Sequence, residues 1–283
     1  MVADISPASA LNEFRKSHPT RFLDVGVSEQ SLIGISSGLA INGFKVFAYT
    51  IANFAIYRPF EQIRVDLCYQ NLPVVVVGVG GGVSYSALGS THHTIEDVAV
   101  MSALPNMTIL APCDPSEVVS CVEQISQISG PAYLRLGKSG EPILTKSAVE
   151  DFKIGKVRQI KSGRTIAILG YGPILGLAFD ALNQLSNLRD EISIYSVHTL
   201  KPLDDNRIIE ILNKYSKIII LEEHVHNGGL STLVTKISAE TRLKTDLRFI
   251  NLKDDYVHTY GSRNDVLEAH NISLPRLLKE ILN

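Results

Sequence analysis

The sequence predicts an α/β fold of two doubly wound domains, each with a mostly parallel sheet covered by helices. Its 283 residues are enough for two domains of ordinary size. Short apolar runs alternate with stretches of helical periodicity, which is typical of parallel strands joined by crossover helices. The alternation pauses at residues 137–164, where glycine, proline and charged residues are frequent, and then restarts. We therefore expect a first domain over 1–145, a linker over 146–163 and a smaller second domain over 164–283.

Local patterns predict each element of the first domain. A helix that starts near Glu29 ends at Asn42-Gly43, a typical stop signal, and a strand follows at 44–49. A helix at 53–69 contains Pro59, which must lie in its first turn or at a kink. The strand at 73–79 shows no polar alternation, which indicates burial on both faces. After a loop at 80–93 we expect a helix at 95–103, a strand at 107–111, a helix at 114–126 and a strand at 132–136.

The second domain repeats the same alternation of strand and helix. We expect its strands at 165–170, 192–197, 217–222 and 247–252, and its helices at 173–185, 204–214, 229–238 and 273–282. A Gly-Tyr-Gly-Pro turn at 170–173 joins the first of these strands to the first helix.

Composition narrows the class of protein. The chain is 45% hydrophobic and 20% charged, which provides for well-buried cores. A net charge of −2 gives no attraction to nucleic acid or to a membrane surface, and no apolar run is long enough to span a bilayer. The N-terminus lacks the pattern of a signal peptide, and Cys68, Cys113 and Cys121 are scattered without metal-binding spacing. We therefore expect a protein of the reducing cytoplasm.

Glu29 is the most informative single residue. It stands where a turn enters a helix of apolar and small residues, a composition that favours close burial. A buried carboxylate without a partner is very costly, so such a side chain must be paired, neutralised or used in chemistry. These residues alone leave a second interpretation open, in which an exposed glutamate is favoured by the dipole of the helix.

The segment Gly26-x-x-Glu29-Gln30 resembles the pyrimidine-binding signature of the transketolase family of thiamine diphosphate enzymes. Five further blocks agree with that family in order and spacing, and together they cover nearly the whole chain. They are the aromatic helix entry at 49–64, the Gly-x-Thr-His loop at 89–97, the strand-to-helix segment at 104–117, Leu-Lys-Pro-Leu-Asp at 200–204 and Glu-Glu-His-x-x-x-Gly-Gly at 222–229. The resemblance implies a pyrimidine-binding domain followed by a transketolase C-terminal domain.

The resemblance also assigns roles around the cofactor. Glu29 corresponds to the carboxyl that hydrogen-bonds the aminopyrimidine ring of thiamine diphosphate, and burial favours the proton sharing that this role requires. Phe54 corresponds to the aromatic residue that stacks on that ring, although a lone phenylalanine at helical spacing is otherwise a core residue. Tyr57 or Phe60 is expected to supply a further aromatic wall, and Arg58 is expected to be a structural charge.

His92 corresponds to the histidine that handles the sugar substrate, and an imidazole suits this task because it donates or accepts a proton near neutral pH. The adjacent His93 either contacts substrate or points elsewhere, and two neighbouring histidines without partners fit a metal site poorly. Arg135 matches the arginine that binds the substrate phosphate. Two other contacts of the common sugar-phosphate enzymes are replaced, an aspartate by Leu88 and a phosphate-facing histidine by Gly80. We therefore expect an unusual sugar.

The resemblance implies a partner subunit. Asp4 lies in a segment that resembles the family's Ala-Asp-Leu-(Ser/Thr) element, which approaches the thiazolium ring. In the family a helix and most of a strand precede this element, so we expect a shortened N-terminal edge. The family holds the diphosphate through Mg²⁺ on a Gly-Asp-Gly motif in a separate domain, and this motif is missing from the sequence. The chain is therefore identified as the C-terminal subunit of a split transketolase. An N-terminal subunit would supply the metal and diphosphate contacts in an α2β2 assembly with β–β contacts, and the chain alone would be inactive.

Transfer of a two-carbon ketol unit between sugars is the leading hypothesis, with alternatives in two classes. A 1-deoxyxylulose-phosphate-synthase-like enzyme would generally keep the aspartate that Leu88 replaces, and a 2-oxo acid dehydrogenase β subunit would typically lack Thr-His-His. A non-catalytic partner subunit is favoured by the shortened N-terminus and disfavoured by the intact Glu29, Phe54 and His92. A dinucleotide-binding dehydrogenase is rejected, because the sequence lacks the glycine-rich fingerprint with its distal acidic residue.

Overall fold

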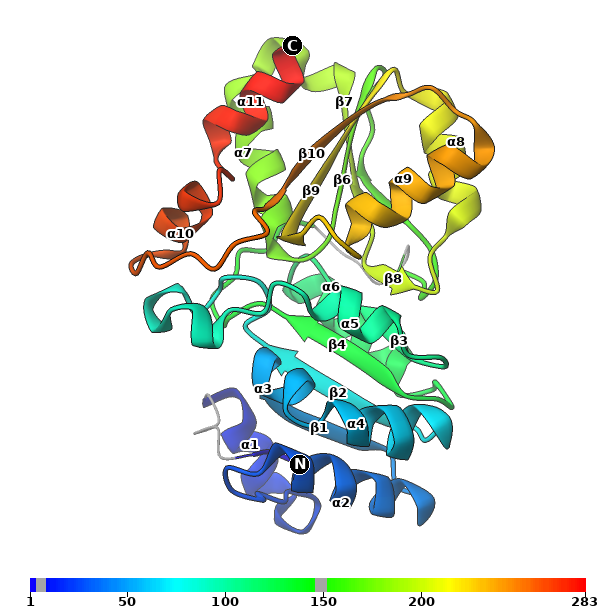
Figure 1. Ribbon diagram of the computed structural model, residues 1–283, viewed down its shortest axis with the longest axis vertical. Helices are drawn as coiled ribbons and strands as arrows, with labels where there is room; N and C mark the ends of the chain where they lie inside the picture. The colour runs from blue at the N-terminus through cyan, green and yellow to red at the C-terminus, as the bar shows by residue number, and fades with distance from the viewer. Residues whose placement is uncertain (4–8, 146–151) are drawn as a thin grey trace.

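The computed structural model describes residues 1–3, 9–145 and 152–283 and shows two α/β halves stacked along the long axis of the molecule (Figure 1). Each half is built on a sheet of five strands with helices on both faces. The α/β fold with two doubly wound units is therefore confirmed. The N-terminus lies in one half and the C-terminus at the far end of the other (Figure 1).

The sheet of the first half is parallel except at one edge. In spatial order its strands are β1 (Val46–Ile51), β2 (Val74–Val79), β4 (Ala132–Leu136), β3 (Thr108–Leu110) and β8 (Thr199–Lys201). Strand β2 is buried along its whole length, because Val74 and Val76 enter one core cluster whereas Val75 and Val77 enter another. Burial on both faces is what its uninterrupted apolar sequence predicts.

The sheet of the second half has the same plan. In spatial order its strands are β10 (Asp246–Leu252), β9 (Lys217–Val225), β6 (Ile166–Gly170), β7 (Ile192–Ser196) and β5 (Arg158–Lys161). Strand β5 pairs antiparallel with β7, although its residues fall in the predicted linker. Strand β8 follows β7 in the chain but pairs antiparallel with β3, so the second half completes the sheet of the first.

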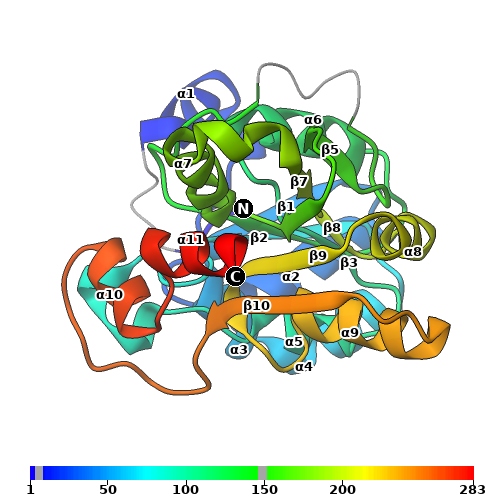
Figure 2. The ribbon, with the colours of Figure 1, turned by 90° about the horizontal axis from the view of Figure 1, so that it is seen from above.

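Helices cover both faces of each sheet. In the first half they are α1 (Ser9–Ser17), α2 (Glu29–Ile41), α3 (Ala52–Tyr57), α4 (Phe60–Gln62), α5 (Asp97–Ser102) and α6 (Pro115–Ile125). In the second half they are α7 (Gly176–Gln184), α8 (Asp205–Lys214), α9 (Leu230–Thr241), α10 (Arg263–Ala269) and α11 (Leu274–Leu282). In the second half, α8 and α9 pack on one face of the sheet and α7, α10 and α11 on the other (Figure 2).

Local exceptions have local causes. The helix expected at 53–69 is broken at Pro59, which lacks a backbone N–H and whose ring crowds the preceding turn. Helix α3 therefore ends at Tyr57, and after α4 the chain continues as a π-helix, Ile63–Tyr69. Helices α1 and α10 were not predicted, although α10 begins with a complete capping box between Ser262 and Asp265.

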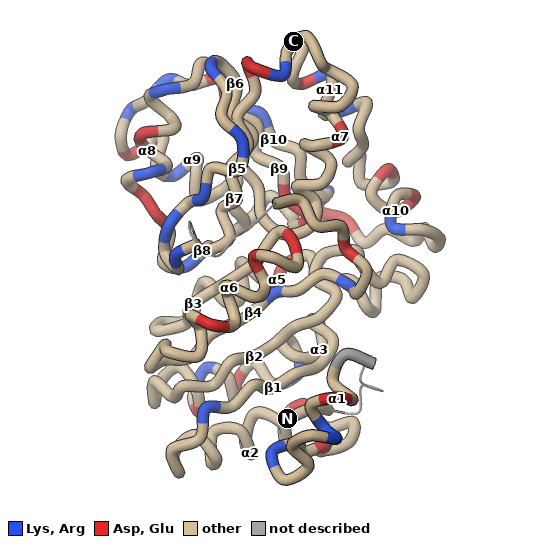
Figure 3. Tube along the Cα trace, turned by 180° about the vertical axis from the view of Figure 1, so that it is seen from behind, with Lys and Arg blue, Asp and Glu red and all other residues tan. Residues whose placement is uncertain are grey.

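The two halves share buried surface. One hydrophobic cluster contains residues of both, among them Ile109 of β3 and Leu200 of β8. Acidic positions gather where the halves meet, beside α5 and near the end of β9 (Figure 3). Several of these carboxylates are fully buried, including Asp97 and Glu117. Among the residues that the structure describes, none of the helices has the length and apolar character that crossing a membrane requires.

His198 makes this junction sensitive to pH. Its ring is completely buried and stacks on Phe152 with ring centroids 4.0 Å apart. Burial, and then the charge of Arg158, lower the pKa of His198 to about 3. In the unfolded chain this histidine binds a proton below about pH 6.5, whereas in the folded chain it stays neutral down to about pH 3. Protonation therefore favours the unfolded chain, so the stability of the folded protein is unaffected by His198 above about pH 6.5 and decreases as the pH falls towards 3.

We expect the free energy of unfolding to fall by roughly 2 kcal/mol more between pH 7 and pH 4.5 in the natural protein than in His198→Gln, which cannot bind the proton. Urea unfolding curves of both proteins at the two pH values measure how much each loses in free energy of unfolding. The carboxylates are the same in both proteins, so their contribution drops out of the comparison. Equal pH dependence in both proteins would contradict the assignment.

Candidate functional site

Glu29 is the first residue of α2 and is buried, with 5% of its surface exposed. The exposed alternative for this glutamate is therefore wrong. Nη1 of Arg58 lies 3.0 Å from both carboxylate oxygens, so the buried charge is paired. Arg58 directly follows α3, whose residues pack against β1 and β2, and this packing brings the guanidinium to α2.

The same guanidinium covers an aromatic ring. Its central carbon lies 3.9 Å from the ring centroid of Phe54, and the ring of His92 meets Phe54 edge-on at a centroid distance of 5.1 Å. Glu29, Arg58, Phe54 and His92 therefore form one cluster, called here the Glu29 cluster. It unites a buried carboxylate, a flat aromatic surface and an imidazole, which together suit a planar ligand with hydrogen-bond donors on its edge.

Arg58 was predicted to be a structural charge, and it pairs with Glu29 at the centre of the Glu29 cluster. A sequence signal was present, because Phe54 and Arg58 are four residues apart and such side chains are neighbours on a helix. The contact with Glu29 carried no such signal, because 29 residues separate the two in the chain.

A hydrogen bond ties the loop that carries His92 to helix α3. The side-chain amide of Asn53 donates to the carbonyl of Thr91, and the Thr91 hydroxyl lies 3.0 Å from Nδ1 of His92. The two histidines of this loop then separate. His92 is partly exposed against Phe54, whereas His93 is buried and lines a different cavity.

Tyr57, predicted to contact the cofactor, also lies beside that second cavity. Its hydroxyl donates to the carboxylate of Glu96 over 2.8 Å. Burial, together with the nearby carboxylates of Asp97 and Glu96, raises the pKa of Tyr57, so the phenol stays protonated and acts as a donor. The structure thus divides the predicted residues between the Glu29 cluster and a cavity behind the histidine loop.

Arg135, predicted to bind a substrate phosphate, lies deep between the two halves. It is 3% exposed, its Nε donates to Asp97 over 2.7 Å, and its Nη2 donates to the carbonyl of Glu223 over 2.9 Å. The hydroxyl of Tyr133 donates to the same Asp97 oxygen over 2.7 Å. This geometry gives Arg135 a structural role, and its predicted contact with phosphate stays a prediction.

The glycine run at the start of the loop supports this arrangement. The amides of Gly80 and Gly81 both donate to the carbonyl of Leu136 over 2.9 Å, so neither is directed at a ligand. A Cβ atom on Gly81 would lie 2.8 Å from the Arg135 side chain. The absence of a side chain here therefore lets the buried guanidinium approach the backbone. Asp4, predicted to lie near the cofactor, falls outside the described residues.

Two family models match the chain. The pyrimidine-binding domain of transketolase matches residues 1–141, and the transketolase C-terminal domain matches residues 155–276. The second match includes β5, in agreement with its place in the second sheet.

Relatives in other organisms agree with these models. One subunit of the apulose-4-phosphate transketolase of Phocaeicola vulgatus is 30% identical over 282 residues, covering 100% of this chain and 89% of the relative. A 1-deoxy-D-xylulose-5-phosphate synthase of Clostridium acetobutylicum is 28% identical over 291 residues. That match covers 100% of this chain and 45% of the synthase. A solved structure described as a split gene transketolase, inactive beta4 tetramer, is 29% identical with a TM-score of 0.89, covering 100% of this chain and 90% of that one.

Proposed function

The chain belongs to the transketolase family, and from this premise we propose that it transfers a two-carbon ketol unit between sugars as the C-terminal subunit of a thiamine diphosphate-dependent transketolase. The relatives and the split-gene structure support a subunit and not a whole enzyme. The observation that carries the proposed chemistry is the Glu29 cluster, in which a buried carboxylate lies beside an aromatic ring.

The residues of the cluster fit an aminopyrimidine ring. Such a ring is flat and presents hydrogen-bond donors on its edge. The guanidinium of Arg58 is also flat and donor-rich, and it bonds both oxygens of Glu29 while it covers Phe54. Arg58 therefore stands in for the chemical group that we propose to bind there, and Glu29 and Phe54 would hold the ring once Arg58 swings away.

When bound, thiamine diphosphate would supply the nucleophilic carbon that takes up the two-carbon unit. Glu29 would hold the proton shared with the pyrimidine edge, at a position where burial excludes water from the carboxylate. Phe54 would fix the plane of the ring. His92, partly exposed and held through Thr91, would orient the oxygens of the sugar and donate or accept protons there.

We propose that a separate N-terminal subunit holds Mg²⁺ and the diphosphate in an α2β2 assembly. The sequence lacks the family's Gly-Asp-Gly motif. The split-gene neighbour is an inactive tetramer of β chains, which accords with a β chain that needs its partner. A cytoplasmic location accords with three cysteines that are all buried as free thiols.

The predicted substrate is an unusual sugar. Leu88, at the position of the family's donor-contacting aspartate, is half exposed, and its side chain has no group that could form a hydrogen bond to a sugar. At Gly80 a Cβ atom would lie 2.1 Å from the ring of Tyr85, so the phosphate-facing histidine of the common enzymes could not occupy this position without displacing Tyr85. These features favour a donor that makes few phosphate contacts with this chain.

The test is reconstitution. The chain is co-expressed with the candidate N-terminal subunit, and ketol transfer is measured with and without thiamine diphosphate and Mg²⁺, for the complex and for each subunit alone. Activity that requires both subunits and both additives is expected. Decarboxylation of pyruvate in the same samples would favour the synthase-like or 2-oxo acid dehydrogenase alternative. A stable complex that turns over neither substrate class would favour a non-catalytic subunit.

Arg58→Met should tighten binding of thiamine diphosphate to the complex by about three- to tenfold. The aminopyrimidine ring would no longer compete with the salt bridge and the cation–π contact that Arg58 makes. Arg64→Met is the matched control, since Arg64 pairs only with the exposed Glu61 among the described residues. Isothermal titration calorimetry of the complex measures both dissociation constants. Weaker binding in Arg58→Met would show that Arg58 holds the cofactor and does not stand in for it.

A further inference from the structure

The histidine loop, residues 86–92, consists of two short 3₁₀ turns, Ser86–Leu88 and Ser90–His92, which are joined by Gly89. Gly89 has a φ of 74°, in the region of backbone conformation that favours glycine. Its carbonyl accepts the backbone N–H of His92 over 2.9 Å. The position of Gly89 therefore helps to fix the backbone from which the ring of His92 projects.

A segment of the second half runs along this loop. It comprises residues 256–261, called here the tyrosine segment, and lies between β10 and α10. The hydroxyl of Ser86 donates to the carbonyl of Gly261 over 2.9 Å, and the hydroxyl of Ser90 donates to the carbonyl of Val257 over 2.8 Å. As the loop advances from Ser86 to Ser90, its partners go back from Gly261 to Val257. The two segments therefore lie side by side and run in opposite directions.

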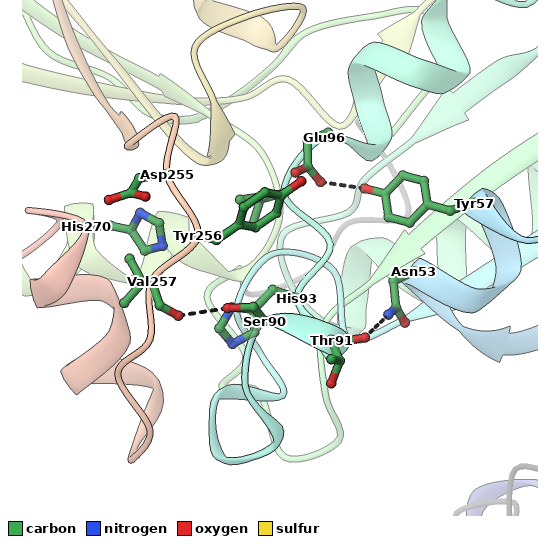
Figure 4. A pocket seen from close by; sticks show the side chains of 11 residues that line it. Asn53, Tyr57, Ser90, Thr91, His93, Glu96, Asp255, Tyr256, Val257 and His270 are labelled. Carbon is green, nitrogen blue, oxygen red and sulfur yellow. Dashed lines mark hydrogen bonds between the residues drawn. The ribbon is translucent and has the colours of Figure 1, made fainter.

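The histidine loop is held between the two halves of the molecule (Figure 4). On one side Ser90 bonds to Val257, and on the other the side-chain amide of Asn53 donates to the carbonyl of Thr91. Asn53 belongs to α3, which also carries the Phe54 ring that His92 meets edge-on. The backbone beside His92 is therefore fixed by contacts with both halves.

Tyr260 makes the contact in the middle of the loop. A Cβ atom on Gly89 would lie 2.5 Å from Cε1 of Tyr260, so the tyrosine ring packs directly against the Gly89 backbone. Tyr260 is nevertheless 67% exposed, and residues 258–262 are all exposed, so the ring buries little surface in either core. Its contact with Gly89 therefore acts on the histidine loop and contributes little to the stability of the fold.

We propose that the tyrosine segment positions His92 for the sugar substrate, with Tyr260 as the positioning residue. This inference rests on the proposed ketol transfer, in which His92 orients the oxygens of the sugar. Tyr260 acts through Gly89, whose carbonyl holds the backbone of His92. A displacement of about 1 Å in such a group can lower a rate about a hundredfold, so the second half contributes to the reaction through the loop.

The first test is Tyr260→Ala in the reconstituted complex. Its kcat for ketol transfer should fall about ten- to hundredfold, because His92 is no longer held in place. The dissociation constant of thiamine diphosphate should stay within about twofold, because neither Glu29 nor Phe54 belongs to the histidine loop. Tyr260→Phe keeps the ring against Gly89 and should keep kcat within about twofold. His258→Ala changes another exposed residue of the tyrosine segment and is the matched control.

Three results of this test would overturn the inference. The first is an unchanged kcat in Tyr260→Ala. The second is a higher KM for the sugar at unchanged kcat, which would make Tyr260 a substrate contact. The third is loss of subunit assembly, seen by light scattering, which would place Tyr260 in the interface with the partner subunit.

Hydrogen exchange of the full chain without its partner gives a second readout, which needs no activity. The backbone amide of His92 donates to Gly89, so its exchange, followed by NMR, should be about tenfold faster in Tyr260→Ala at an unchanged thermal midpoint. Faster exchange in a chain whose complex transfers no ketol unit would support the positioning contact and refute only the proposed function. Equal exchange in both proteins would overturn the inference even if the complex is active.

A variant that leaves Tyr260 in place tests the rest of the segment. Ser86→Ala combined with Ser90→Ala removes both hydroxyl bonds to the tyrosine segment, and it should speed exchange of the His92 amide and lower kcat, each about three- to tenfold. Ser126→Ala is the matched control, because it removes an exposed bond from a serine hydroxyl to the carbonyl of Glu123. Exchange and kcat unchanged in the double variant would overturn the role assigned to the segment.

Discussion

Replacing Glu29 with glutamine is expected to lower kcat of the reconstituted enzyme by about 10²- to 10⁴-fold, the usual contribution of a positioned acid–base group. The amide has nearly the shape of the carboxyl but cannot take up or share a proton with the pyrimidine edge. The loss should fall on kcat, with a smaller effect on the dissociation constant of the cofactor, because Phe54 and the partner subunit still bind it. Steady-state ketol transfer and calorimetric titration on the same complex separate the two quantities.

The control for this substitution is Glu61→Gln, which makes the same chemical change at an exposed carboxylate paired with Arg64. Its kcat should equal that of the natural protein. If the Glu29→Gln enzyme binds the cofactor and its kcat lies within threefold of the natural value, Glu29 takes no part in the chemical step. Loss of subunit assembly in Glu29→Gln, seen by light scattering, would instead give Glu29 a structural role.

Replacing Arg135 with methionine is expected to lower the free energy of unfolding by about 3–5 kcal/mol, the usual cost of breaking a buried ion pair. The substitution leaves the fully buried Asp97 with only the Tyr133 hydroxyl on one oxygen, and within the described residues its other oxygen has no partner. It also removes the bond to the carbonyl of Glu223, which links the first half to the second. Urea denaturation followed by circular dichroism measures the change.

Two further variants show whether the loss of stability comes from the broken ion pair. Arg64→Met removes an exposed arginine and should change stability by less than about 0.5 kcal/mol. The double variant Arg135→Met with Asp97→Asn removes both charges and should recover part of the loss, because no unpaired charge is left in the core. An Arg135→Met protein as stable as the natural one, or one that binds substrate phosphate less tightly at unchanged stability, would return Arg135 to the role that the family resemblance implies.

The architecture of this protein could be predicted from its sequence because local patterns determine it. The apolar run of β2, the stop at Asn42-Gly43 and the break at Pro59 each depend on neighbouring residues, and the structure has all three. The family resemblance placed Glu29, Phe54 and His92 at one predicted site, and the structure brings these three together around Arg58.

Pairings between distant segments were decided only by the tertiary structure. Strand β8 pairs with β3 at the edge of the first sheet, and β5, from the predicted linker, pairs with β7 at the edge of the second. The sequence of each strand does not specify which sheet edge it will join. Arg135 is buried against Asp97, where its motif predicted a contact with phosphate. Periodicity reports which face of an element is apolar, whereas the partner of a charged side chain depends on how elements far apart in the chain pack. The ion pair of Glu29 and the hydrogen bond from Arg135 to the carbonyl of Glu223 across the two halves are therefore properties of the fold.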